Sequence, residues 1–391
     1  MANVVCLQSK RNNMDILVRT QQLDKVFSYT EKVELEDSNL EIIPFQFEET
    51  SKEIENFQQR ISTSEFYPVK DNEIIENKLF NYYVFTPKGK TKKEEAILLL
   101  HGLNERFWKK YLCWAEYLTQ TTGKPVILFP LAFHMNRTPA SWINPRVARP
   151  WINQRMQEIP HLENSTFVNL ALSSRLSQQP IRFYISGMES ANNILQLMTE
   201  IKNGQHPLFK ENTTVHLFGY SIGAFLSEIL LLANPKNCFT NSRLFMFCGG
   251  SIFSQMNANA RDILDNVAND KIQHYFNTDF LTEYSTSSDD NSLEKAFKSM
   301  IRPDVLADFR EGFFLETKKR IRSVSLKNDT VIPTSGIVTA LGRSSDEIVE
   351  EMDFPFPYSH QWPFPLATKG NKEVINETFR EVFDKAANFY N

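Results

Sequence analysis

Short runs of consecutive apolar residues alternate along the chain with longer segments in which apolar residues recur every three or four positions. The short runs lie at 96–100, 126–129, 215–218 and 244–248, and alternating segments of similar length lie at 81–86 and 321–326. Uninterrupted apolar runs are typical of strands buried on both faces of a parallel sheet. The periodic segments lie at 104–122, 189–202, 224–233 and 374–389 and predict helices. Strands that alternate with helices indicate βαβ units, and the sequence therefore predicts an α/β fold.

Two stretches interrupt this alternation. Residues 132–185 contain five prolines and predict a loop-rich insert, whereas residues 251–319 are charged and helical in period. Both follow predicted strands, at the sheet edge where an open α/β sheet places its ligand crevice. We expect 251–319 to form a mostly helical lid over that crevice, although plain surface decoration would produce the same pattern.

The inserts divide the predicted core into two parts, 80–250 and 320–391. Residues 1–79 carry no motif and form an N-terminal extension of unknown role. Their alternating segment at 40–47 would either add edge strands or cover the sheet.

Composition narrows the class of protein. The 391 residues include 43 basic and 47 acidic side chains, a net charge of −4, which argues against a nucleic-acid-binding domain. No run of about 18 uncharged apolar residues is present, so we expect no integral membrane association. The first thirty residues lack the apolar stretch of a secretory signal, and the 4 cysteines form no CxxC pair. We therefore expect a cytoplasmic protein in a reducing compartment.

The segment Gly219-Tyr220-Ser221-Ile222-Gly223 lies between a predicted strand and a predicted helix. This is the GxSxG pattern of a nucleophile elbow in the context that it requires. A serine at a tight strand-to-helix turn projects its hydroxyl from the sheet edge, and glycines two residues away leave room for the neighbouring strand and helix. Ser221 is therefore the candidate nucleophile, and a plain glycine-rich turn is the alternative.

A serine hydroxyl needs a base, and in this arrangement the acid and the histidine follow the serine in the chain. Of the two downstream histidines, His274 falls in the helical insert, whereas His360 lies in a proline-rich loop before the last helix. His360 is the candidate base, with a surface-loop histidine as the alternative.

The acid must orient the imidazole and offset the charge that it gains. Asp329 directly follows the strand predicted at 321–326 and is the candidate. Asp353, seven residues before His360, remains a rival. The other acidic residues before His360 lie in 344–351, which predicts an exposed charged helix.

Two backbone N–H groups are expected to hold the negative oxygen of a tetrahedral intermediate. One belongs to Ile222, directly after the nucleophile, and the other to Leu103, in the loop after the strand at 96–100. Gly102 allows this loop to turn sharply, and His101 would orient it.

With these pieces the sequence resembles the α/β-hydrolase superfamily: strand-His101-Gly102, the Gly219–Gly223 elbow, Asp329 after a late strand and His360 before the last helix. The resemblance implies a mainly parallel sheet of about eight strands flanked by helices, and acyl-enzyme chemistry without a metal or organic cofactor. Many members carry a short Asp-Arg-Gly-type turn where this chain has residues 130–139.

In that departing segment, His134 and Arg137 would face the crevice and bind substrate, Arg137 through an anionic group. A surface ion pair is the alternative for Arg137. No HExxH or P-loop motif points to metal or nucleotide chemistry.

The sequence thus predicts a serine hydrolase acting on a small-molecule carboxylic ester or thioester. Acyl transfer or peptide cleavage would use the same triad, and a non-catalytic binding protein on this scaffold is a third possibility.

Overall fold

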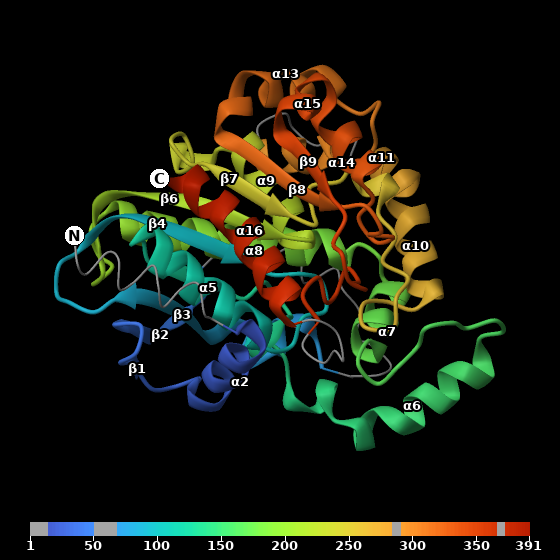
Figure 1. The fold of residues 1–391 in the computed structure, drawn as a ribbon. Coiled ribbons are helices and arrows are strands. Elements are labelled where there is room, and N and C mark those ends of the chain that lie inside the picture. Colours follow the sequence, from blue (N-terminus) through green and yellow to red (C-terminus); the bar gives the residue numbers. More distant parts are fainter. Residues whose placement is uncertain (1–14, 51–68, 284–290, 366–371) are drawn as a thin grey trace.

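The computed structural model describes residues 15–50, 69–283, 291–365 and 372–391 (Figure 1). In this described part, nine strands form one sheet in the order β1-β2-β3-β5-β4-β6-β7-β8-β9. The strands are β1 (Val33–Leu35), β2 (Leu40–Glu48), β3 (Leu79–Pro87), β4 (Lys93–Leu100), β5 (Val126–Leu128), β6 (Phe209–Tyr220), β7 (Leu244–Phe247), β8 (Ile321–Leu326) and β9 (Val349–Met352). Strands β4 to β9 are parallel, whereas β1, β2 and β3 pair antiparallel with their neighbours.

Helices cover both faces of the sheet (Figure 1). One face packs against α2 (Ile16–Val26), α5 (Lys109–Thr122) and α16 (Lys372–Tyr390), and the other against α8 (Arg182–Lys202) and α9 (Ile222–Ala233). Because side chains alternate along a strand, Phe218 of β6 joins the first core and Leu217 the second. This arrangement confirms the predicted α/β class and is the α/β-hydrolase fold that the resemblance implies.

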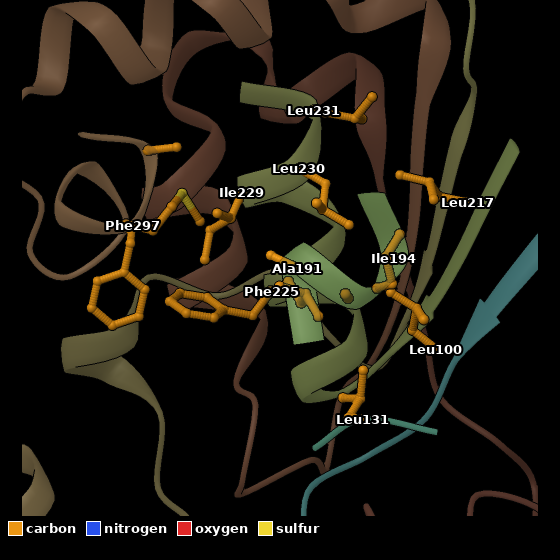
Figure 2. Packing of buried hydrophobic residues seen from close by; sticks show 14 of the residues in the cluster. Leu100, Leu131, Ala191, Ile194, Leu217, Phe225, Ile229, Leu230, Leu231 and Phe297 are labelled. Carbon is orange, nitrogen blue, oxygen red and sulfur yellow. The ribbon is translucent and has the colours of Figure 1, made fainter. Parts of the chain in front are cut away.

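Figure 2 shows the core between the sheet and helices α8 and α9. Phe225 and Ile229 of α9 lie close to Phe297, whereas Leu217 and Leu100 come from the sheet. Burial of such side chains from water is the main stabilising term for the layered arrangement. The same packing fixes α9, which begins directly after Ser221.

The N-terminal extension adds β1 and β2 to the antiparallel edge of the sheet, where β2 pairs with β3 along its full length. With these two strands, the sheet of the described part has nine strands, whereas the sequence predicted about eight.

Residues 132–185 differ from the predicted loop-rich insert, because they form α6 (Pro145–Glu158), α7 (Leu170–Gln178) and the start of α8. Pro145 occupies the first turn of α6, where a missing N–H costs no intrahelical bond, and the Asn144 side chain caps the helix at the N–H of Arg146. Proline therefore starts this helix instead of preventing it. Figure 1 shows α6 at the periphery of the molecule, where Arg155 pairs with Asp265 at the start of α10 (Asn266–Asn277) at 2.8 Å.

Apart from 284–290, which lie outside the described part, residues 251–319 are mostly helical, as predicted. They form α10 (Asn266–Asn277), α11 (Asp279–Glu283), α12 (Ser292–Ser299) and α13 (Ala307–Thr317). Helix α10 packs against α7, and α12 packs against α9. Their role as a lid stays a prediction.

The helix predicted at 344–351 is wrong in its second half. Only α15 (Ser345–Ile348) is helical, and the next residues form β9, which pairs with β8 at the sheet edge. Glu350 and Glu351 are exposed there, as charged residues often are on short edge strands. Such a strand lacks the apolar run that identifies a buried one.

Candidate active site

Ser221 forms the turn between β6, which ends at Tyr220, and α9, which begins at Ile222. Its φ of 55° and ψ of −122° lie in a region that residues with side chains rarely adopt. Its N–H donates to the carbonyl oxygen of Phe247 at 3.3 Å, and its own carbonyl accepts from the N–H of Ala224 at 3.0 Å. The surrounding backbone therefore holds a strained conformation of the kind found at functional sites.

The neighbouring glycines are required by close backbone approach. A Cβ on Gly219 would lie 2.4 Å from the Cα of Ala224, and one on Gly223 would lie 2.3 Å from the carbonyl oxygen of Leu100. Gly249, which follows β7, is equally constrained, since its Cβ would lie 2.7 Å from the carbonyl oxygen of Ser221. Sequence reasoning missed Gly249 because this contact joins two strands and belongs to no local motif.

Three side chains predicted from the sequence form a continuous hydrogen-bonded relay. Ser221 Oγ lies 2.7 Å from His360 Nε2, and His360 Nδ1 lies 2.7 Å from Asp329 Oδ2. A carboxylate only accepts, so Nδ1–H donates to Asp329 and leaves Nε2 free to accept from the serine hydroxyl. The other oxygen of Asp329 accepts from the N–H groups of Val331 and Ile332, both at 2.9 Å. All three side chains are buried, so water competes little for these bonds.

Tyr220 supports the histidine in a way that the sequence did not indicate. Its hydroxyl donates to the carbonyl oxygen of His360, and the two rings stack with centroids 5.7 Å apart. Burial raises the pKa of Tyr220 well above its usual range, so the hydroxyl remains a donor. The only signal was the position of Tyr220 inside the GxSxG segment.

Asp353, the rival acid, lies elsewhere. It is exposed, pairs with Lys327 at 3.2 Å and accepts from Tyr358 and Asn328. Its contacts fix the loop before His360, whereas Asp329 makes the bond to the imidazole.

Leu103 and Ile222, the two expected oxyanion donors, line one cavity. The end of β4 packs directly against the start of α9, because a Cβ on Gly223 would lie 2.3 Å from the carbonyl oxygen of Leu100 and 2.8 Å from that of His101. Within the described part, neither the N–H of Leu103 nor that of Ile222 donates a hydrogen bond to another residue. Both donors are therefore available to a bound group.

His101 orients this turn and is not a base. Its Nδ1 donates to the carbonyl oxygen of Gly102, and its Nε2 accepts from the N–H of Leu131, both at 2.9 Å. Complete burial lowers the pKa of His101 well below its usual range and keeps the ring neutral. The N–H of Gly102 donates to Tyr111, which further fixes the turn.

Two cavities meet at Leu103. The small cavity, of about 50 Å³, is lined by apolar side chains of α8, α9 and α12 and includes Ile222. The large cavity, of about 470 Å³, is lined by residues 103–110 and by Gln361 and Trp362, next to His360. Ser221, His360 and Asp329 line neither cavity themselves, but the small cavity adjoins Ile222, directly after Ser221, and the large cavity adjoins Gln361, directly after His360.

The prediction that Arg137 faces the crevice is wrong. Arg137 is completely buried and pairs with Glu189 at 3.1 Å. It also donates to both the side chain and the backbone of Asn77, to Asn193 and to the carbonyl oxygen of Pro130. These bonds attach the loop after β5 to α8, and they leave Arg137 no role at a substrate.

His134 does line the small cavity, as expected of a crevice residue. Its Nδ1 donates to the carbonyl oxygen of Ala132 at 2.8 Å. Burial lowers the pKa of His134 to about 4, so the ring is neutral near pH 7. Its Nε2 has no hydrogen-bond partner in the described part of the chain.

Among the described residues, no group of three or more His, Cys, Asp or Glu side chains is arranged to hold a metal ion. Within the same residues, no helix combines the length and the apolar character needed to cross a membrane.

A family model described as "Family of unknown function (DUF6051)" matches residues 9–391. No curated protein sequence matches the chain.

Solved structures resemble it only distantly. A hyperthermophilic esterase from Pyrobaculum calidifontis is 8% identical, with a TM-score of 0.42 over 98% of this chain and 97% of the esterase. The esterase Est22 is 12% identical, with a TM-score of 0.46 over 91% of this chain and 83% of its own. The Pyrococcus horikoshii acylaminoacyl peptidase is 12% identical, with a TM-score of 0.42 over 88% of this chain and 41% of the peptidase.

Proposed function

The chain belongs to DUF6051, a family of unknown function, and from its site we propose that it is a serine hydrolase that cleaves a carboxylic ester or thioester through an acyl-enzyme intermediate. One observation carries the proposal: the unbroken relay from Asp329 through His360 to Ser221, at a strained turn beside two free N–H groups.

The proposed first step is attack of Ser221 Oγ on the acyl carbon while His360 Nε2 takes the hydroxyl proton. Asp329 offsets the positive charge that the imidazole gains. The N–H groups of Leu103 and Ile222 bind the negative oxygen, and each such donor typically contributes about 2.7–4 kcal/mol to the barrier reduction.

In the next step His360 returns the proton to the leaving oxygen or sulfur, the bond to the acyl carbon breaks, and an acyl-Ser221 ester remains. Water then adds to this ester as His360 takes its proton. Collapse releases the acid and returns the proton to Ser221.

The alternative of a non-catalytic binding protein does not account for the strain at Ser221. A binding surface needs neither a serine at positive φ nor a buried carboxylate bonded to a histidine. Both features follow naturally if the serine is a nucleophile.

A fluorophosphonate probe tests the proposal, because it reacts covalently with activated serines. We expect labelling of the full chain, and loss of the label in Ser221→Ala. Ser227→Ala is the matched control: this serine is also buried on α9 but donates to the carbonyl oxygen of Gly223, so the label should remain. A folded wild-type protein that stays unlabelled would contradict the proposal.

Hydrolysis of p-nitrophenyl esters from acetate to palmitate then measures turnover and the acyl length accepted. Formation of free acid distinguishes hydrolysis from acyl transfer, which leaves the acyl group on another nucleophile.

A further inference from the structure

The large cavity is the one that adjoins the segment directly after His360. Its lining includes Gln361 and Trp362, directly after His360, and Leu103. Because the base must return its proton to the leaving atom, the leaving group has to lie on the side of His360. The small cavity, which contains Ile222 but neither of the residues after His360, is then left for the acyl group.

Arg106 is the cation in this cavity that lacks a counter-ion. Lys109 pairs with Asp24 at 2.7 Å, and Lys110 pairs with Glu105. Arg106 has no carboxylate within ion-pair distance in the described part of the chain.

The contacts of Arg106 are with neutral groups. Its guanidinium donates to Asn104 Oδ1 at 3.1 Å and to the carbonyl oxygens of Val168 and, at 3.4 Å, Trp142. Its Nε–H has no acceptor among the described residues. Burial lowers the pKa of Arg106 to about 10, which still leaves it charged at neutral pH. A partly desolvated charge without a counter-ion is unfavourable, and a bound anion would relieve that cost.

Apart from Arg106 and the two ion pairs Lys109–Asp24 and Lys110–Glu105, one charged group lines the cavity and limits the charge of the ligand. Asp262 lines the same cavity and is exposed to solvent, which screens it. A cavity lined by one cation without a counter-ion and by one screened carboxylate suits a single negative charge better than the double charge of a phosphate.

We propose that Arg106 binds a carboxylate carried by the leaving group of the substrate. This inference rests on the proposed function. Arg106 would then have the role that was expected of Arg137 from the sequence, namely binding an anionic group of the substrate. Arg106 lies 31 positions earlier, on the loop that supplies Leu103, and lines the large cavity.

The rim of the cavity adds flat apolar surface. Phe107, Trp362 and Tyr29 are 57%, 41% and 41% exposed and all line it. An aromatic leaving group would pack against these rings. The same rings together with Asp262 would instead favour a cation if Arg106 played no part, and the test must therefore include a cationic ligand.

Three acetate esters that share one acyl group provide the test: 4-acetoxybenzoate, its methyl ester, and 4-acetoxybenzyltrimethylammonium. Each kcat/KM is divided by the rate of the same ester with hydroxide, which removes differences in leaving-group acidity. For the wild-type chain we expect the carboxylate to exceed the neutral ester by about 10- to 100-fold, as for a hydrogen bond to a charged group.

Arg106→Gln should bring this ratio close to one, and Arg106→Lys should retain part of it. The ratio is measured within one preparation, so a partly unfolded variant does not alter it, and a merely structural role would lower both rates in parallel. Arg261→Gln is the matched control, since it removes an exposed arginine next to Asp262 that does not line the cavity.

A wild-type ratio near one, a preference for the trimethylammonium ester, or a carboxylate preference that survives in Arg106→Gln would overturn the inference while leaving the hydrolase intact. If no ester is hydrolysed and the fluorophosphonate leaves Ser221 unlabelled, the proposed function fails, and the inference fails with it.

Discussion

The two cavities beside Leu103 are built from different kinds of structure. The small one is enclosed mainly by helices α8, α9 and α12, with Leu103 and residues of the loop after β5, and its lining residues Phe225, Ile229 and Phe297 belong to the core in Figure 2. The large one is enclosed mainly by loop residues, with aromatic rings and charged groups in its walls.

This difference separates two kinds of selectivity. Core helices cannot move without disrupting close packing, so we expect the small cavity to keep a fixed shape and to discriminate by size. The loops place charged and aromatic side chains along the wall of the large cavity, so we expect this cavity to discriminate by charge and aromatic contact. We infer that Ser221 acts on substrates whose acyl group is selected by its size in the small cavity and whose leaving group is selected by its charge in the large cavity.

The largest effects are expected from variants that remove the proposed nucleophile or its base, because every substrate depends on them whichever cavity it occupies. Ser221→Ala and His360→Ala should each lower kcat by about 10⁶ for every ester, because the relay acts as a unit. Asp329→Asn should lower it by about 10⁴ through the wrong imidazole tautomer. Steady-state hydrolysis of the p-nitrophenyl ester that wild type turns over fastest measures these losses.

Asp353→Asn is the control for the acid, because its carboxylate bonds to Lys327 and Tyr358 instead of His360. A loss from Asp353→Asn with Asp329→Asn harmless would reassign the acid. Unequal losses for different esters in Ser221→Ala would show that the two cavities do not share one nucleophile.

The sequence predicted what local geometry dictates. Ser221 was found because its turn needs Gly219 and Gly223, and chain order then pointed to Asp329 and His360. The strand and helix pattern likewise followed from apolar periodicity, which burial imposes on each element separately.

What the sequence could not predict depends on contacts between distant segments. Arg137 resembles a crevice residue until Glu189, which lies 52 positions away on α8, is found to neutralise it. Arg106 resembles a surface residue until the carbonyl groups of Val168 and Trp142 are seen to cover it. Partners of this kind are set by packing, and no local pattern encodes them.

Gly187→Val on α8 tests whether the small cavity selects the acyl group by its size. Gly187 lines the small cavity, and a Cβ added there would meet no heavy atom within 4 Å apart from the backbone of its own helix, so a side chain can begin at this position and reduce the volume of the cavity. We expect the longest acyl chain that wild type accepts to lose about 10-fold or more in kcat/KM, as for one excess methylene, while the acetate ester is unaffected.

Gly187→Ala is an intermediate step and should also gain about 1 kcal/mol of helix stability. The carboxylate preference measured with the acetate esters should stay at its wild-type value in both variants. A change in that preference, or an unchanged acyl length, would contradict the separation of the two cavities.

A smaller effect is expected from the aromatic wall of the large cavity. Trp362→Ala removes a partly exposed ring two residues after His360 in the chain and should lower kcat/KM for aromatic leaving groups by about 2- to 10-fold. Alkyl leaving groups with the same acyl group should change less, because they lack the stacked surface. Phe167→Ala, an equally exposed ring outside both cavities, should have no effect.

The smallest effect on turnover is expected from Glu228, which lies on α9 among the residues that shape the small cavity but lines neither cavity. Its carboxyl oxygens are buried and have no hydrogen-bond partner in the described part, and burial raises the pKa of Glu228 well above its usual range. The folded chain therefore keeps a proton that the unfolded chain releases above a pH of about 4.3.

Because the folded state binds the extra proton, this group lowers the free energy of unfolding as pH rises above its unfolded pKa, by up to about 1.4 kcal/mol per pH unit.

Glu228→Gln keeps a neutral side chain of the same shape and cannot titrate, so its stability relative to wild type should increase between pH 5.5 and pH 7.5. Urea unfolding at both pH values measures the difference, and the exposed Glu31→Gln provides the control. Acyl-length selectivity should stay at the wild-type value, since the shape of α9 is retained. Equal pH dependence in wild type and Glu228→Gln would show that Glu228 is ionised in the folded chain. The helices around the small cavity would then contain a buried charge that their apolar packing does not explain.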